Sequence, residues 1–321
     1  MTALHTLLSA TPTTPGATID PQLAARIVDT LWPIREQALD TNDVGTLAGF
    51  ETGSALQGDT ADQVTITCGC SGPLPRPVAT QYLFVPKQSA YPSWFISELT
   101  TSPVEGSSPD VSLMVFTRAS PATQWMVSLE TGYSFASGAA WVYATPEAMA
   151  GGFDLPTPTR NELPGDLAAY YQYWANAGSA PTSPFAPGVF TSAIGQTQAK
   201  LDTTLAGEGQ VHRVVYSIDL AHDGVWSVAA NNVAEQPVYG WGLTCGTVRY
   251  EAVTTLASGA APMVQPVDRS TWGSTLTPGR YTEITQWGLH ESCFLDDTAG
   301  VPFIVLGHNG GVIRSVGVSA G

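Results

Sequence analysis

Residues 111–133, VSLMVFTRASPATQWMVSLETGY, contain two apolar runs separated by a short segment with a proline. Both runs, 111–118 and 124–133, are rich in apolar, β-branched and aromatic residues, which is typical of strands. The Ser and Pro between them favour a turn. We therefore expect half-buried antiparallel strands here. Further strands of this kind are predicted at 79–86 and 94–100, with a shorter one at 64–67.

Helices are predicted before these strands. Asp20 is placed to cap the amino end of a helix whose first residue is Pro21. The apolar face of this helix, at helical spacing, consists of Leu23, Ile27, Leu31 and Ile34. Pro33 predicts a kink or a split within it. A short second helix over 44–50, capped by the preceding Asn-Asp pair, is expected to end at Gly53.

The second half of the chain repeats this order of elements. Helices are predicted at 164–177 and 189–205. Five strands are predicted to follow, at 211–220, 225–233, 239–256, 281–295 and 303–318. Tight hairpin turns are predicted at His222-Asp223-Gly224 and at 308–311, His-Asn-Gly-Gly, because Asp-Gly and Asn-Gly favour the backbone angles of short hairpin loops.

These patterns predict an α+β protein with two tandem domains, each with amino-terminal helices packed on a curved antiparallel sheet. Such a sheet must have one face covered, and the helices provide the cover. A chain of 321 residues is long enough for two such cores. The expected organisation is a disordered stalk at 1–18, a first domain at 19–135, a connector at 136–162 and a second domain at 163–321.

The order of elements resembles the cystatin-like or nuclear-transport-factor-2-like α+β cone. Residues 38–47, ALDTNDVGTL, and 50–56, FETGSAL, are also similar to the start of a family of extracytoplasmic, lipoprotein-like proteins of actinobacteria. The segments at 91–95, 115–118 and 124–126 resemble that family as well. The resemblance implies the cone fold and a place outside the cytoplasm, where the family is typically held by a lipid or transmembrane anchor. It implies no activity.

The composition favours an extracytoplasmic protein. Only 12% of residues are charged, against roughly 25% in an average soluble domain. The net charge of −15 argues against binding to nucleic acid or anionic lipid. No run approaches the ~18 apolar residues of a spanning helix, and the first ten residues lack the pattern of a signal peptide. Residues 11–18, TPTTPGAT, are typical of a stalk. A trimmed upstream signal or anchor is one explanation, and a cytoplasmic start with a flexible leader is the alternative.

The four cysteines are Cys68, Cys70, Cys245 and Cys293. An even, small count fits two disulfides in an oxidising compartment, and four cysteines allow three pairings. Pairing within each half gives Cys68–Cys70 and Cys245–Cys293, the second worth roughly 4 kcal/mol in the chain-entropy model. Zinc is the competing ligand, but Cys-Gly-Cys is shorter than the usual zinc spacing. We expect no metal and no cofactor.

Two places in the sequence are candidates for a site. In Asp219, His222 and Asp223 a carboxylate could orient an imidazole for general-base work, although a hairpin turn with polar tips explains the same residues. Glu51 is a candidate if it is buried, because burial would raise its pKa. The alternative for Glu51 is a capping or solvent-facing carboxylate.

Other residues give weaker signals. Tyr82 and Trp94 are candidates to line a pocket between helices and sheet. His290 and Glu291 are neighbours in a predicted strand, so they point to opposite faces and cannot act on one substrate atom. We expect both to be structural or to lie at the surface.

The sequence lacks the common motifs of hydrolases and nucleotide-binding enzymes. The function we expect is therefore a non-enzymatic binding or accessory module of the cell envelope that engages a partner protein or a small ligand. One alternative is a small-molecule enzyme or lipid carrier that uses a cavity between helices and sheet. A second alternative is a structural protein of a larger assembly.

Overall fold

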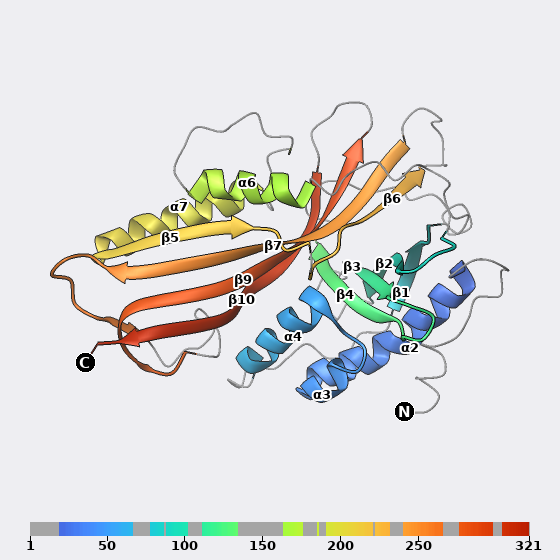
Figure 1. The fold of residues 1–321 in the computed structure, drawn as a ribbon, viewed down its shortest axis with the longest axis horizontal. Helices are drawn as coiled ribbons and strands as arrows, with labels where there is room; N and C mark the ends of the chain where they lie inside the picture. Colours follow the sequence, from blue (N-terminus) through green and yellow to red (C-terminus); the bar gives the residue numbers. More distant parts are fainter. Residues whose placement is uncertain are drawn as a thin grey trace.

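The fold is α+β, with two antiparallel sheets and five helices in the part of the chain that the structure describes (Figure 1). The structure is a computed structural model. It describes residues 19–66, 78–86, 88–101, 111–133, 163–175, 185, 191–220, 222–231, 240–265, 276–297 and 304–320. The α+β prediction is confirmed, whereas the predicted stalk at 1–18 and connector at 136–162 lie outside the described residues.

The first helix, α2, spans Pro21–Asp40. The Asp20 side chain accepts a hydrogen bond of 2.8 Å from the Leu23 amide, which confirms the predicted cap. The helix continues through Pro33, so the predicted split is wrong. Trp32 and Arg35 on either side of this proline are both buried. Packing of both turns in one core thus outweighs the hydrogen bond that Pro33 cannot make.

Gly53 begins a helix instead of ending one. The short helix α3 spans Val44–Leu47, and α4 then spans Gly53–Ile66. The predicted strand at 64–67 is therefore wrong where it is described, because 64–66 continue α4. Gly53 has a φ of +61°, a value that lets the chain turn sharply at the start of α4. Ser54, Ala55 and Asp59 are buried at helical spacing. This pattern in α4 outweighs the alternation of apolar and polar residues at 64–67.

The first sheet is a meander of four strands in the order β1-β2-β3-β4. The strands are β1 Val78–Phe84, β2 Ser93–Thr101, β3 Val111–Arg118 and β4 Met126–Tyr133, as the sequence predicts. The predicted half-burial is wrong for β3, in which six of eight side chains are buried. Phe116 packs toward α2 while Leu113 and Val115 pack toward the second sheet, so both faces of β3 are covered.

The second half begins with two helices, α6 at Leu163–Ala175 and α7 at Ser192–Gly207. The second sheet has the order β10-β9-β7-β5, with β6 also paired to β7 and β8 to β9. Its strands are β5 Gln210–Ser217, β6 Trp226–Asn231, β7 Gly240–Leu256, β8 Met263–Gln265, β9 Gly279–Asp297 and β10 Ile304–Ser319. The predicted helices and five strands are confirmed, and β8 is an addition.

Both predicted hairpins are wrong. Residues 308–311 lie inside β10, where Asn309 pairs with Glu291 of β9. Residues 222–224 do form a turn, but β5 and β6 on either side of it pair with successive parts of β7 and not with each other. Asn-Gly and Asp-Gly permit a hairpin, but the long partner strands β7 and β9 decide the pairing in both places.

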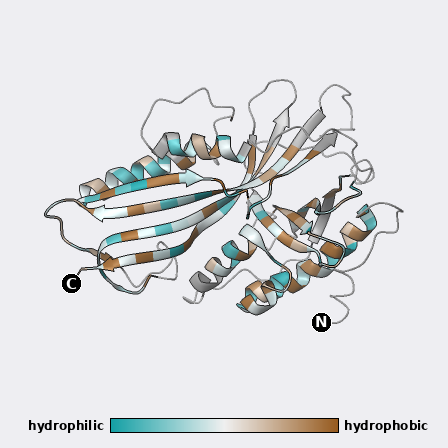
Figure 2. Cartoon of the chain, in the orientation of Figure 1, coloured by the Kyte–Doolittle hydropathy of each residue, from teal (hydrophilic) through white to brown (hydrophobic). Residues whose placement is uncertain are grey.

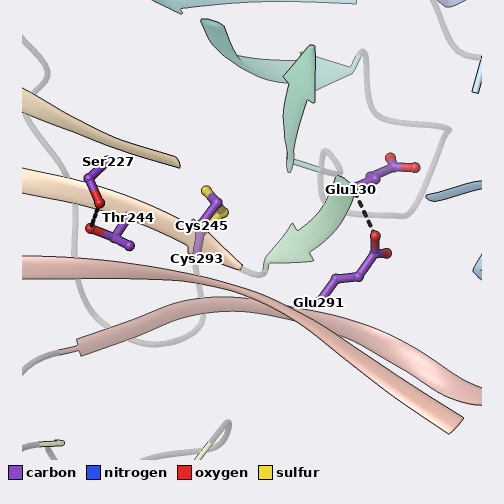
Figure 3. The surroundings of a disulfide bond; sticks show 6 residues. All are labelled: Glu130, Ser227, Thr244, Cys245, Glu291 and Cys293. Atoms are coloured by element: carbon purple, nitrogen blue, oxygen red, sulfur yellow. Dashed lines mark hydrogen bonds between the residues drawn. A yellow bond between two sulfur atoms is a disulfide. The ribbon is translucent and has the colours of Figure 1, made fainter. Parts of the chain in front are cut away.

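The packing order is α2, first sheet, second sheet, α6. One buried cluster joins α2 to the first sheet, a second joins the two sheets, and a third joins α6 to the second sheet. The predicted disulfide Cys245–Cys293 is confirmed and lies within the cluster between the sheets, where the two cysteines pair directly across β7 and β9 (Figure 3). Cys68 and Cys70 lie outside the described residues.

Candidate functional site

A buried arginine lies where the first half of the chain meets the second sheet. Arg35 of α2 is 2% exposed. Its Nε donates to Glu51 Oε1 at 2.6 Å, and its Nη2 contacts the carboxylates of Asp59 and Glu130. Glu51 follows α3 and bridges to Val127 of β4, Asp59 lies on α4, and Glu130 lies on β4. One guanidinium thus meets three carboxylates from three parts of the first half.

A fourth carboxylate comes from the second sheet. Glu291 of β9 is 1% exposed, and its Oε1 accepts a hydrogen bond of 3.2 Å from the Glu130 amide (Figure 3). Ser54 of α4 lies in the same junction, where it donates to Ser128 O at 3.1 Å and accepts from Thr247 of β7 at 3.0 Å. We refer to Arg35, Glu51, Asp59, Glu130 and Glu291 as the Arg35 cluster.

Burial decides the ionisation of this cluster. Loss of solvent raises the pKa of Glu51, and the Arg35 charge opposes this shift without cancelling it. Burial likewise raises the pKa of Glu130, and it raises the pKa of Glu291 well above its ordinary value. The neighbouring charge of Asp59 raises the pKa of all three in the same direction. These carboxyl groups are thus placed to hold protons at a pH where exposed ones are ionised.

One carboxyl oxygen of the cluster lacks the hydrogen bond that a buried, ionised carboxylate needs. Glu51 Oε2 is buried and accepts no hydrogen bond in the structure. Its side chain is within hydrogen-bonding range of Asp59, which also contributes to the raised pKa of Glu51. A proton on Glu51 would turn this pair from two repelling acceptors into a donor and an acceptor.

Glu51 is the one predicted site residue in this cluster. It is buried, as the site prediction required, so a solvent-facing carboxylate is excluded. Arg35, Asp59 and Glu130 are absent from the predicted candidates. A weak signal exists for Arg35, which falls four residues after Leu31 on the apolar face of α2. Glu130 interrupts an apolar strand in a similar way.

The structure brings together part of the second predicted site. His222 Nδ1 lies 2.7 Å from Asp219 Oδ2, and both side chains are largely exposed. Asp223 faces away from this pair and instead accepts two hydrogen bonds from Arg249, of 2.5 and 2.7 Å. Arg249 also donates to Gln57 of α4 at 2.9 Å, so Asp223 supports a contact between the halves.

The remaining candidates occupy separate places. Trp94 is partly buried and packs against the cluster between the sheets. Tyr82 lies in β1 opposite Glu98, and its side chain is outside the described part. His290 stacks on Tyr250 with 4.9 Å between ring centroids. Glu291 lies on the other face of β9, so the expectation of opposite faces is confirmed.

Within the described residues no group of three or more His, Cys, Asp or Glu is arranged to hold a metal ion. In the Arg35 cluster, the guanidinium occupies the position between carboxylates that a cation would take. No helix in the described part of the chain is long and apolar enough to cross a membrane.

Comparison with known proteins gives one match. Residues 15–210 match the family model of a domain of unknown function, DUF8094. The chain belongs to the DUF8094 family. The matched DUF8094 segment contains four members of the Arg35 cluster, whereas Glu291 lies beyond it. No curated protein and no solved structure matches the chain.

Proposed function

We propose that the chain is a non-enzymatic extracytoplasmic module of the cell envelope that binds a partner protein through the outer part of its second sheet. The observation that carries this proposal is an exposed sheet face with apolar side chains. In Figure 1 the outer ends of β5, β7, β9 and β10 extend away from the first sheet. Apolar and polar residues alternate along these strands (Figure 2).

The register of the strands identifies the side chains on this face. Directly paired residues of adjacent strands point to the same side of a sheet. One row across the four strands is Val215, Glu251, Trp287 and Arg314, and the next is Arg213, Val253, Thr285 and Val316. A third row begins at Val211 and ends at Val318. We refer to these three rows as the open face.

The open face combines exposed valines with a polar group at one end. Val211 is 55% exposed, Val318 54% and Val316 44%. In the first row, Trp287 Nε1 donates to Glu251 Oε2 at 2.8 Å, and the Arg314 guanidinium lies over the Trp287 ring at 4.9 Å. Trp and Arg are the residues that most often dominate the energetics of protein–protein contacts. A partner with apolar side chains beside a polar group would suit this surface.

The adjacent edge of the sheet, at β5, is occupied by a side chain at Val214 and Tyr216. Gln172 of α6 donates to Val214 O at 2.9 Å and accepts from the Tyr216 amide at 2.9 Å. Its amide thus takes the backbone positions on β5 that an added strand would use. This favours contact with the open face over extension of the sheet at β5.

The proposal extends to the cellular compartment and to the fold type of each half of the chain. The Cys245–Cys293 disulfide supports an oxidising location. The packing of α2 on the first sheet and of α6 on the second supports the assignment of two cystatin-like or nuclear-transport-factor-2-like units. The resemblance of 38–56, 91–95, 115–118 and 124–126 to an anchored family of actinobacteria supports attachment to the cell envelope through an anchor.

The test is affinity capture from the envelope fraction with identification of bound proteins by mass spectrometry. The chain with Val211→Ser and Val316→Ser should lose a partner that the native chain retains. The matched control is Val264→Ser on β8, which changes another exposed valine outside the open face and should retain the partner. Equal capture by the double variant and the native chain would refute the proposal.

A ligand-binding alternative has one supporting observation. A cavity of about 260 Å³ lies between the end of α7 and the strands β8 and β9. Its lining includes Leu205, Gln210, Met263 and Ile284. By contrast, the space between α2 and the first sheet is packed with Phe50, Phe95 and Trp125 among other side chains. We rank partner binding first because this cavity is small for a ligand site, at the lower limit of roughly 300 Å³.

A further inference from the structure

We propose that the Arg35 cluster is a proton-controlled latch. Its carboxyl groups hold protons in the folded chain and so keep α4 and β4 packed against β9. Loss of those protons loosens this junction. The cluster contains members from both halves, since Glu291 belongs to β9 and the others to the first half. The inference is independent of the proposed binding function.

The charges within the cluster cannot balance without protons. Three carboxyl groups contact one guanidinium, and a fourth, Glu291, accepts from the amide of Glu130; every member is buried or nearly so. If all four were ionised, the junction would hold a net charge of −3 away from solvent. Buried charges of one sign are strongly unfavourable, and carboxyl groups in this position take up protons instead.

The unpartnered oxygen of Glu51 marks one place for such a proton. Glu51 is 1% exposed, and its Oε2 accepts no hydrogen bond. A buried acceptor in this state carries a cost, because it has lost its hydrogen bonds with water and gained none within the protein. When protonated, the oxygen becomes a donor toward Asp59, and the cost is removed.

The groups that face the cluster come from every element packed around it. Arg35 comes from α2, Asp59 and Ser54 from α4, Glu130 from β4, and Glu291 from β9. Ser112 of β3 donates to Glu130. Arg249 of β7, which contacts Gln57 of α4, is engaged by Asp223.

The latch lies beside the core that the two sheets share. Glu291 and Cys293 are two residues apart on the same face of β9, so the cluster adjoins the disulfide (Figure 3). Loosening α4 and β4 from β9 would therefore admit water to the edge of that core.

The direction of the pH effect follows from the raised pKa values. A carboxyl group whose pKa is higher in the folded chain contributes its full stability below its unfolded pKa of about 4. That contribution is lost as the pH rises through the folded pKa, because the folded chain must then release its proton. The free energy of unfolding should therefore fall as the pH rises from mildly acidic to alkaline.

The experiment compares urea unfolding of the full chain at about pH 6 and about pH 9 with that of two isosteric variants. The unfolding equilibrium constant of the native chain should rise at least about tenfold, which corresponds to one pKa unit. Glu291→Gln removes one proton-holding group, so its rise should be smaller and the variant should be more stable than the native chain at the higher pH. Glu283→Gln, on the part of β9 beyond the cluster, should retain the native rise.

Hydrogen exchange at the two pH values locates the change. Corrected for the intrinsic pH dependence of exchange, peptides from α4 and β4 should lose more protection than peptides from the outer part of β7. A native chain whose stability does not fall between the two pH values would overturn the latch. Uniform loss of protection along the chain, or an equal pH response in Glu291→Gln and Glu283→Gln, would also overturn it.

Discussion

Arg35 illustrates how a single charged residue can organise a junction from inside an apolar helix face. It lies in line with Ile27 and Leu31, where a leucine would pack well. The guanidinium reaches past this core to Glu51 through Nε and to Asp59 and Glu130 through Nη2. Without it, carboxyl groups from three elements would meet in the interior with no cation between them.

We expect Arg35→Met to destabilise the chain by about 3–5 kcal/mol, because it leaves buried carboxylates without their partner. Urea unfolding monitored by circular dichroism measures this loss. Arg26→Met, on the exposed side of the same helix, is the matched control and should change stability by less than about 0.5 kcal/mol. Similar unfolding of the two variants would show that the guanidinium has no role in holding the carboxylates.

At the level of single residues, the sequence indicates Glu51 but not the other members of the Arg35 cluster. Glu51 follows a helix that the local sequence predicts, and burial is the condition under which it would be a site residue. Arg35 lies 16 residues before Glu51, and Glu291 lies 161 residues after Glu130. Contacts of this separation have no local signal, since they arise only when α2, α4 and β9 meet.

Among the elements, β9 carries the most contacts that the sequence alone could not assign. It pairs with β7 on one side and with β10 on the other. On one of its faces Glu291 and Cys293 meet the first half, and on the other His290 packs against tyrosines. The alternation of side chains along a strand makes both roles compatible.

Gly288 of β9 provides a test of this packing. It pairs directly with Tyr250 of β7, and a Cβ at this position would overlap the tyrosine ring that stacks on His290. Gly288→Ala should therefore cost about 1–3 kcal/mol through overpacking. Gly311→Ala in β10, where a Cβ meets no atom within 4 Å, is the control and should be nearly neutral. Thermal unfolding of both variants distinguishes the outcomes, and equal midpoints would contradict this account of the Tyr250 contact.

The elements were more predictable than their partners. Strand positions follow from runs of eight or more residues rich in apolar and β-branched side chains, as in β3 and β7. Asn309 and Gly310 show where this fails, because the Asn-Gly pair is locally suited to a hairpin but lies within a strand paired to β9 throughout. The apolar run of β3 similarly predicted one covered face, and the second sheet covers the other.

At the scale of the whole molecule, the core between the sheets links the two halves. Leu113 and Val115 of β3 belong to the same buried cluster as Leu243 and the Cys245–Cys293 disulfide. Neither sheet can expose this face to water without losing apolar burial, worth roughly 25 cal/mol per Å². The helices α2 and α6 lie outside this cluster, in cores of their own.

This arrangement predicts that damage to the shared core reaches both outer helices. Leu113 is 1% exposed, and Leu113→Ala should cost about 2–5 kcal/mol. Hydrogen exchange followed by mass spectrometry should then show equal losses of protection in peptides from α2 and α6, because global unfolding exposes both. Leu201→Ala on α7, at a leucine that is 44% exposed, is the control and should leave both unchanged. Loss confined to α2 would mean that the halves unfold separately, and that the core between the sheets is an interface and not part of one cooperative unit.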